Sequence, residues 1–215
     1  MLLSMQSFSN KNNPIDYIRI NYNNTIELEE ILDINKLEQN EFYDTNKLII
    51  NNLISTWYKI IKSIDNIKSI NVDFICEIHT YVMCNLLDMR QLGHLRNQPV
   101  TLYRLDYVPK KILNKHKISD DIYNILYEND EADIIDKILR LYIYLIREQL
   151  FIDGNKRTAF MVTNFLLIQN KVGILEYNKE NYKKFLKNLY NYLEYNLDEE
   201  SFISIIKSNY IKYYN

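Results

Sequence analysis

The residues best suited to chemistry lie together at positions 151–157, in the order Phe-Ile-Asp-Gly-Asn-Lys-Arg. Gly154 is one of only three glycines in the 215-residue chain, and the residues after it open an apolar segment with helical spacing. Backbone N–H groups at a glycine turn and at a helix N-terminus both favour an anion, and the forked guanidinium of Arg157 suits a phosphate. Asp153 can hold a hard divalent cation against the same anion. This stretch therefore predicts a phosphate site.

A simpler interpretation is a corner between two helices in which Asp153 or Asn155 only caps the second helix. A cap accounts for one polar residue. It does not account for Lys156 and Arg157 at a helix N-terminus, where cations are unfavourable unless an anion is present. The charge pattern therefore favours an anion site.

Residues 149–160, Gln-Leu-Phe-Ile-Asp-Gly-Asn-Lys-Arg-Thr-Ala-Phe, resemble the signature of the Fic (Fido-domain) family, H-P-F-x-[D/E]-G-N-G-R-x-x-R. The Asn-Lys-Arg-Thr-Ala ending is closer to the Doc branch, the toxin half of a toxin–antitoxin pair. Upstream, Gly93-His94-Leu95-Arg96 and then Val100 are similar to the family's G-x-x-R…V segment before its β-hairpin flap. Ile78-His79 also stands where the family often has a helical Leu-His. The matches run from about residue 51 to residue 172.

The resemblance implies an all-α fold: a single Fido-like helical domain with a short β-hairpin flap. We expect this domain to span residues 45–215, after an N-terminal arm of residues 1–44 that is poorly matched. The implied activity is that of a transferase, which uses a Mg²⁺-bound nucleotide, with ATP as co-substrate, to transfer AMP to a protein hydroxyl. In the Doc manner the transferred group would be phosphate.

The resemblance also implies roles for the motif residues. Asp153 would hold the metal, and the nucleotide would be bound by Gly154, Asn155, Lys156 and Arg157. A target protein would dock on the flap near Val100–Tyr103, where its segment adds as a strand. An antitoxin is a further candidate partner.

Three positions depart from the family pattern. Gln149 replaces the histidine that takes the proton from the target hydroxyl, and a carboxamide is not a general base near neutral pH. Lys156 replaces the second glycine, as in Doc. Phe160 replaces the last arginine, which the family uses on the γ-phosphate. His94 and His116 are candidate substitute bases, although an ordinary surface or packed histidine accounts for each.

Two functions follow from these departures. One is a Fic-type transferase that is impaired at Gln149, because loss of a positioned base costs about 10²–10⁴-fold in rate. The other is a nucleotide-binding protein without catalysis, such as a pseudoenzyme or a regulatory or toxin–antitoxin module. The sequence alone is compatible with both.

Composition narrows the class of protein further. Lys and Arg number 26 against 28 Asp and Glu, for a net charge of −2, so we expect no nucleic-acid partner. We expect no membrane span, because no apolar run is long enough, and no signal peptide, because the first residues lack a cationic region and an apolar stretch. Cys76 and Cys84 lie about 12 Å apart on one predicted helix, which is too far for a disulfide. We expect two buried thiols and a cytoplasmic location.

Hydrophobic spacing predicts the elements that position the motif. Proline and alternating apolar residues predict a strand at Val100–Tyr103, and Asn71, Asn178 and Asp198 are candidate helix caps. Gly173 is the predicted stop of the helix after the motif. The first predicted helix starts near residue 45. The other predicted helices span residues 72–89, 120–127, 130–149, 155–170, 178–195 and 198–213.

Overall fold

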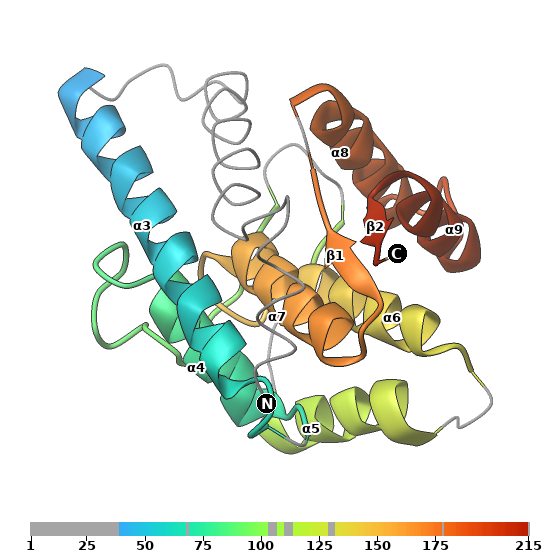
Figure 1. Cartoon of the computed structure of the whole chain (residues 1–215). Coiled ribbons are helices and arrows are strands. Elements are labelled where there is room, and N and C mark those ends of the chain that lie inside the picture. The colour runs from blue at the N-terminus through green and yellow to red at the C-terminus, as the bar shows by residue number, and fades with distance from the viewer. Residues whose placement is uncertain are drawn as a thin grey trace.

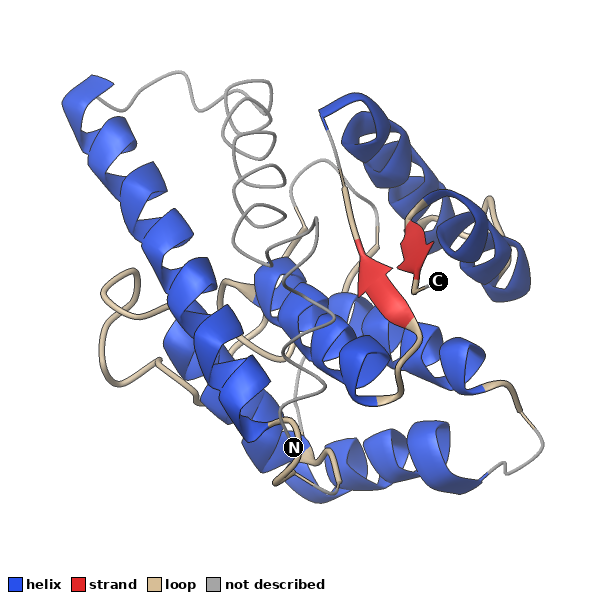
Figure 2. Ribbon diagram, viewed as in Figure 1, coloured by secondary structure: helices blue, strands red, loops and turns tan. Residues whose placement is uncertain are grey.

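The computed structural model describes residues 39–67, 69–102, 107–109, 114–128, 132–177 and 179–214 (Figures 1 and 2). Within these ranges the chain is mainly helical, as predicted. The helices are α3 (Gln39–Ser63), α4 (Val72–Val82), α5 (Lys115–Tyr123), the π-helical turn η1 (Asn124–Glu128), α6 (Ile134–Glu148), α7 (Asn155–Gln169), α8 (Lys179–Leu193) and α9 (Glu199–Asn209). Residues 1–38 of the predicted arm lie outside the described residues, and the predicted boundary at residue 44 falls within α3.

Helix α7 lies at the centre of the described fold (Figure 1). It packs against α6, α4, α3 and strand β1 (Gly173–Leu175). A helix that is apolar on one side only would show one buried stripe. Helix α7 instead buries residues on all its faces, among them Thr158, Ala159, Met161, Val162, Thr163, Asn164, Phe165, Leu166 and Leu167. Its N-terminus, which carries the predicted site, is thus fixed by the core of the protein.

Polar side chains on α7 tie it to its neighbours. The Asn164 side chain donates from Nδ2 to the Leu175 carbonyl (3.2 Å) and accepts from the Leu175 N–H (2.9 Å). Gln169 Nε2, at the last residue of α7, donates to the carbonyls of Ile64 (3.1 Å) and Ile67 (2.5 Å) just after α3. These bonds satisfy backbone groups that would otherwise be buried without partners.

Helix α6 leads into the predicted site. Its N-cap is Asp133, which accepts from the Ile135 N–H (3.1 Å), so the helix starts a few residues later than predicted. The apolar residues Ile138, Leu141, Tyr142 and Leu145 of α6 are buried, but Ile134 in the first turn is 39% exposed.

Helix α4 begins as predicted, with Asn71 accepting from the Phe74 N–H (2.9 Å). It ends at Val82, however, and not at residue 89. Asn85 adopts a left-handed backbone (φ 59°), a conformation that stops a helix. The Asn52 side chain on α3 also donates to the carbonyls of Val82 (3.2 Å) and Cys84 (2.7 Å). These bonds replace the helical bonds that a longer α4 would make.

The strands of the described fold come from other parts of the chain than the predicted flap. β1 pairs in antiparallel register with β2 (Ile211–Tyr213), at the end of the predicted 198–213 helix. Residues 100–102 form no strand, and Tyr103 lies outside the described residues. Gly173 does not end α7. It starts β1, where an added Cβ would lie 2.0 Å from the Lys212 carbonyl oxygen.

The remaining predictions have mixed outcomes. Asp198 caps α9, as predicted, by accepting from the Ser201 N–H (2.8 Å), while Asn178 lies outside the described residues. The 120–127 helix appears as the end of α5 followed by η1. Both cysteines are free, but only Cys76 is partly buried and Cys84 is exposed, because α4 ends before it. No described helix is long and apolar enough to cross a lipid bilayer.

We expect Asn52→Ala to lower the free energy of unfolding by about 1–3 kcal/mol, because Asn52 is buried and its loss leaves two carbonyls unpaired. Urea denaturation measures this directly. Asn51→Ala is the matched control, since Asn51 is exposed on the same helix and should change stability by less than about 0.5 kcal/mol. Equal effects of the two substitutions would contradict the role given to Asn52.

Candidate functional site

The predicted motif forms a sharp corner between α6 and α7, and left-handed residues stand at both of its ends. Gln149 is the C-cap of α6 (φ 48°, ψ 64°), and Gly154 is the N-cap of α7 (φ 76°, ψ 2°). Gly154 also packs closely on α4, because an added Cβ would lie 2.5 Å from Met83 Sδ. Both its backbone angle and its close packing therefore favour glycine.

The side chain of Asn155 points into this corner. Its Oδ1 accepts from the Phe151 N–H (2.9 Å), and its Nδ2 donates to the Phe151 carbonyl (2.8 Å) and to Gln149 Oε1 (3.1 Å). Asn155 is 7% exposed. The family resemblance implied that Asn155 binds the nucleotide, but its carboxamide is already used to hold the corner.

Gln149 is also a satisfied, buried amide. Besides accepting from Asn155, it donates from Nε2 to the Ile146 carbonyl (2.5 Å), and it is 8% exposed. One amide thus ties the last turn of α6 to the first residue of α7. Neither end of the side chain is left to receive a proton from a substrate.

Arg96 caps the C-terminus of α6. Its guanidinium donates to the carbonyls of Gln149 (2.5 Å), Glu148 (3.2 Å) and Gln98 (2.9 Å), and its backbone N–H donates to the Leu150 carbonyl (2.9 Å). A cation at the negative end of a helix dipole is favourable. The family resemblance marked Arg96, and the structure assigns it a capping role.

His79 on α4 joins the corner to the segment before the predicted flap. Its Nδ1 accepts from the Gly93 N–H (3.0 Å), so Nε2 carries the hydrogen and donates to the Asp153 carbonyl (3.1 Å). The ring stacks on Phe151, with 3.8 Å between centroids and 8° between planes. Burial lowers the pKa of His79 from 6.5 to about 4, so the ring is neutral. Only the resemblance to Leu-His pointed to this residue.

The outward groups of the corner are Asp153 and Arg157. Asp153 Oδ1 accepts from the Gly154 N–H (2.5 Å), and Oδ2 accepts from Arg157 Nη2 (3.3 Å). Because Arg157 is paired with this carboxylate, its guanidinium is less available to bind another anion. The Asp153 side chain is 62% exposed, however, and pairs of this kind contribute little.

Two buried polar atoms near the start of α7 are left without a partner. Arg157 Nη1 and Thr158 Oγ1 make no hydrogen bond to any described residue. The N-cap of the helix is a glycine and brings no side chain to the first-turn amides. Unsatisfied buried donors require an explanation. Both atoms are covered by protein, so a ligand oxygen would reach the Arg157 nitrogen only after that side chain turns outward.

The other predicted positions divide between surface and core. Lys156 is exposed beside Arg157. Phe160, which replaces the family's last arginine, packs against Tyr177 with 5.8 Å between ring centroids, so the position belongs to an aromatic cluster. His94 and His116 are both exposed, and His116 lies on α5.

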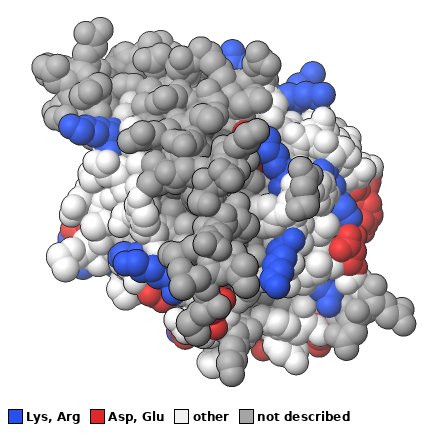
Figure 3. All heavy atoms as spheres, in the orientation of Figure 1, with Lys and Arg blue, Asp and Glu red and all other residues white. Residues whose placement is uncertain are grey.

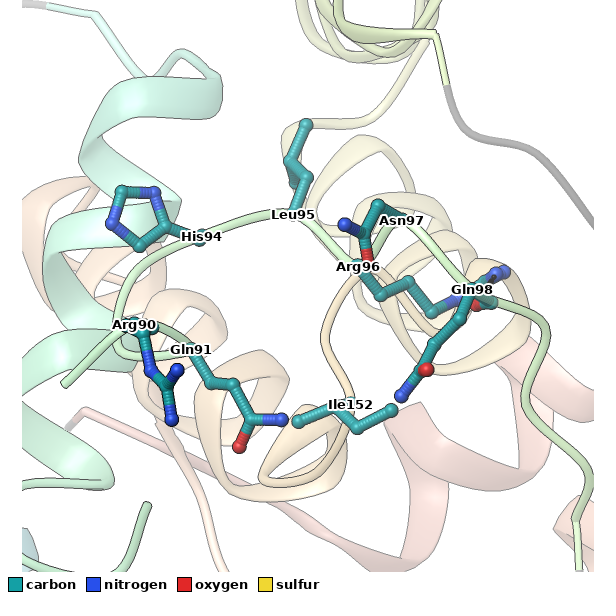
Figure 4. A pocket seen from close by; sticks show the side chains of 8 residues that line it. All are labelled: Arg90, Gln91, His94, Leu95, Arg96, Asn97, Gln98 and Ile152. Atoms are coloured by element: carbon teal, nitrogen blue, oxygen red, sulfur yellow. Dashed lines mark hydrogen bonds between the residues drawn. The ribbon is translucent and has the colours of Figure 1, made fainter. Parts of the chain in front are cut away.

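A pocket of about 420 Å³ opens beside the corner. Its lining residues are Arg90, Gln91, His94, Leu95, Arg96, Asn97, Gln98 and Ile152. In Figure 4 the carboxamides of Gln91 and Gln98 approach Ile152 from opposite sides, while His94 and Leu95 point outward. The volume is within the range of small-molecule sites. Arg90 in this lining donates to Asp88 (2.9 and 3.1 Å) and Arg96 donates to backbone carbonyls. The amide side chains of the lining suit a polar group.

A metal ion at this corner would need ligands besides the protein. No group of three His, Cys, Asp or Glu side chains is arranged to hold a metal anywhere in the described ranges. Asp153 alone offers an exposed carboxylate. Mg²⁺ is commonly bound in this way, by one or two carboxylates together with substrate phosphates and water. The corner therefore fits a metal that arrives with a phosphate.

The surface charge agrees with the composition. On the face in Figure 3, basic and acidic side chains are interspersed over the described residues, and neither sign forms a continuous patch.

The neutral state of His79 predicts a pH-dependent stability. The pKa of about 4 in the folded chain lies below the 6.5 of the unfolded chain, so the unfolded chain binds more protons between these values. The free energy of unfolding should therefore fall as pH drops from 6.5 to 4, by up to roughly 3 kcal/mol from His79 alone.

Urea denaturation of His79→Gln across this range tests the prediction. The variant lacks the titrating ring, so its stability should vary less with pH than that of the natural chain. Other titrations are common to both proteins and cancel in the difference. His116→Gln is the control, because His116 is exposed and its replacement should leave the pH slope unchanged. Parallel profiles for all three proteins would refute the role of His79.

Comparison with known proteins agrees with this geometry. The Fic/DOC family model matches residues 69–167, which include both the corner and the segment from Gly93 to Val100. The chain has no significant match among curated protein sequences.

Solved structures show the same fold. Fic-1 from C. elegans superposes with a TM-score of 0.70 and 18% identity, over 97% of this chain and 63% of that chain. A Fic domain containing signaling protein from Bacteroides thetaiotaomicron gives a TM-score of 0.59 and 14% identity, over 96% and 89%. The chain thus spans less than two thirds of the Fic-1 chain that it resembles. Over residues 69–167 the chain is therefore similar to the Fic/DOC family, and it shares the fold of these Fic proteins.

Proposed function

We propose that this chain is a Fic-type transferase that binds Mg²⁺–ATP at residues 153–157 and transfers AMP, or phosphate in the manner of Doc, to a protein hydroxyl. The proposal rests on the start of α7, where a left-handed glycine opens a helix beside the Arg157 guanidinium. The buried Nη1 of that guanidinium has no partner among the described residues. A phosphate oxygen at this point would satisfy the nitrogen and meet the positive end of the helix dipole.

Each motif residue then has a separate role. Asp153 would hold Mg²⁺, which neutralises phosphate charge when it is bound. Arg157 would clamp the phosphates, and Lys156 would add a point charge at the helix start. Gly154 permits the close approach, and Asn155 contributes indirectly, because its side chain shapes the corner.

Transfer should be slow, because Gln149 supplies no base and its amide is engaged with Ile146 and Asn155. Catalysis would then depend on positioning and charge stabilisation alone. In this proposal a target protein docks near residues 100–102, beside the polar pocket, and the protein acts in the cytoplasm. An antitoxin-like partner remains part of the Doc-like alternative.

The second candidate is a nucleotide-binding protein without transfer activity. Two observations favour it: the satisfied amide of Gln149, and Phe160 packed on Tyr177 where the family has a cation. It shares the nucleotide site with the first candidate and differs only in lacking transfer.

Arg157→Ala should weaken the binding of Mg²⁺–ATP by at least about tenfold, because hydrogen bonds to a charged group contribute about 1.5–3 kcal/mol each. Isothermal calorimetry at constant ionic strength measures the dissociation constant. Lys187→Ala, which removes an exposed cation from α8, controls for net charge and should leave binding unchanged. If the natural chain binds no Mg²⁺–ATP at millimolar concentrations, both candidate functions fail.

Gln149→His distinguishes the two candidates. A neutral imidazole offers one donor and one acceptor nitrogen, as the Gln149 amide does, so the corner should persist. Restoring the base should raise label transfer from ATP to lysate proteins by about 10²–10⁴-fold if transfer is the function. The double variant Gln149→His with Arg157→Ala sets the background, and the intact mass of a modified target separates AMP from phosphate. No gain over the natural chain would exclude loss of the base as the cause of inactivity.

A further inference from the structure

We infer that the Asp153 carboxylate makes the site select metal-bound over metal-free polyphosphate, because it occupies the anion donors until a metal ion draws it away. This inference rests on the proposed nucleotide site and adds a rule for what that site accepts. The evidence for it is the set of contacts that the Asp153 side chain makes.

The two oxygens of Asp153 use two of the groups that a phosphate would use. Oδ1 accepts from the Gly154 N–H at the N-cap of α7 (2.5 Å), and Oδ2 accepts from Arg157 Nη2 (3.3 Å). The carboxylate thus stands at the positive end of the α7 dipole, where an anion is stabilised. In this position it acts as a resident anion in the proposed phosphate site.

The same carboxylate is the metal ligand of the proposed function. It is 62% exposed and can turn on its own side-chain bonds, while its backbone stays fixed by the bond from His79 to the Asp153 carbonyl (3.1 Å). Two arrangements follow. In one, the carboxylate covers Gly154 and Arg157; in the other, it faces a metal and leaves both donors to phosphate.

Metal-free polyphosphate therefore meets two obstacles at this site. It must displace the carboxylate from both donors, and it approaches a like charge within a few ångströms. A metal ion removes both obstacles, because it neutralises the carboxylate and reorients it. Metal and phosphate should thus strengthen each other's binding by equal factors, as linkage requires.

The simpler interpretation is an ordinary surface pair at i, i+4, which contributes little to stability. That interpretation explains the 3.3 Å contact. It does not explain why one arginine nitrogen pairs with Asp153 while Nη1 of the same group stays buried without a described partner. A guanidinium that exchanges the Asp153 carboxylate for a larger phosphate anion would use both of its Nη nitrogens.

Asp153→Ala should have opposite effects under two conditions. With EDTA and no metal, its affinity for ATP should exceed that of the natural chain, by about fivefold, because the competing carboxylate is gone. With excess Mg²⁺, its affinity should fall below that of the natural chain, because the metal ligand is gone. Asp153→Asn keeps an acceptor for the Gly154 N–H without the charge, so its metal-free affinity should lie between the two.

Asp65→Ala is the matched control for charge. Asp65 is exposed, and it lies between Ile64 and Ile67, which bond Gln169 at the far end of α7. The 15 residues of α7 separate it from Asp153 by about 22 Å. Its removal should leave ATP affinity unchanged with and without Mg²⁺.

Isothermal calorimetry with ATP, in EDTA and in excess Mg²⁺, gives the dissociation constant of each protein under each condition. If the natural chain binds Mg²⁺–ATP but Asp153→Ala is no tighter than Asp65→Ala in EDTA, the inference is overturned and the proposed function stands. If no protein binds ATP in either buffer, the proposed function fails and the inference falls with it. Thermal melts of all variants check the fold, which an exposed position should not disturb.

Discussion

The structure of the site depends on one buried imidazole. His79 receives a hydrogen bond from Gly93 and donates one to Asp153, so two left-handed glycine turns that are 61 positions apart in the chain are fixed to the same turn of α4. The bond from Gly93 exists only while the ring is neutral, because a protonated Nδ1 cannot accept. Burial keeps it neutral. The core of the protein therefore sets the position of the corner and of the segment that precedes the predicted flap.

A second set of contacts separates the residues that hold the corner from those that face outward. Arg96, Gln149 and Asn155 use their polar atoms on backbone carbonyls, on the Phe151 N–H and on one another. Asp153 and Lys156 are exposed, and Arg157 is partly exposed. This division is typical of a preorganised site, in which inward groups fix the geometry so that outward groups lose little freedom on binding.

The sequence predicted the helical fold and the corner because both depend on local signals. Apolar spacing marked α6 and α7, and Gly154 between them marked the turn. The roles of Asn155 and His79 could not be predicted in this way, because each depends on which distant backbone groups the fold brings near. The end of α4 was missed for the same reason: Asn52 bonds the carbonyls of Val82 and Cys84, which lie thirty and thirty-two residues later in the chain. The strand at 100–103 was predicted from alternation, which cannot supply a partner strand.

Gln149 illustrates how a motif position can lose its chemistry and keep its structural role. The position joins α6 to α7 through one donor, used on the Ile146 carbonyl, and one acceptor, used on Asn155. A neutral histidine and a glutamine both carry such a pair of groups, but only the histidine can bind a further proton near neutral pH. Glutamine can therefore hold the corner in the same way as a neutral histidine. In the proposed function, this is how an intact Asp-Gly-Asn-Lys-Arg corner would stand beside a missing base without any loss of the fold that positions it.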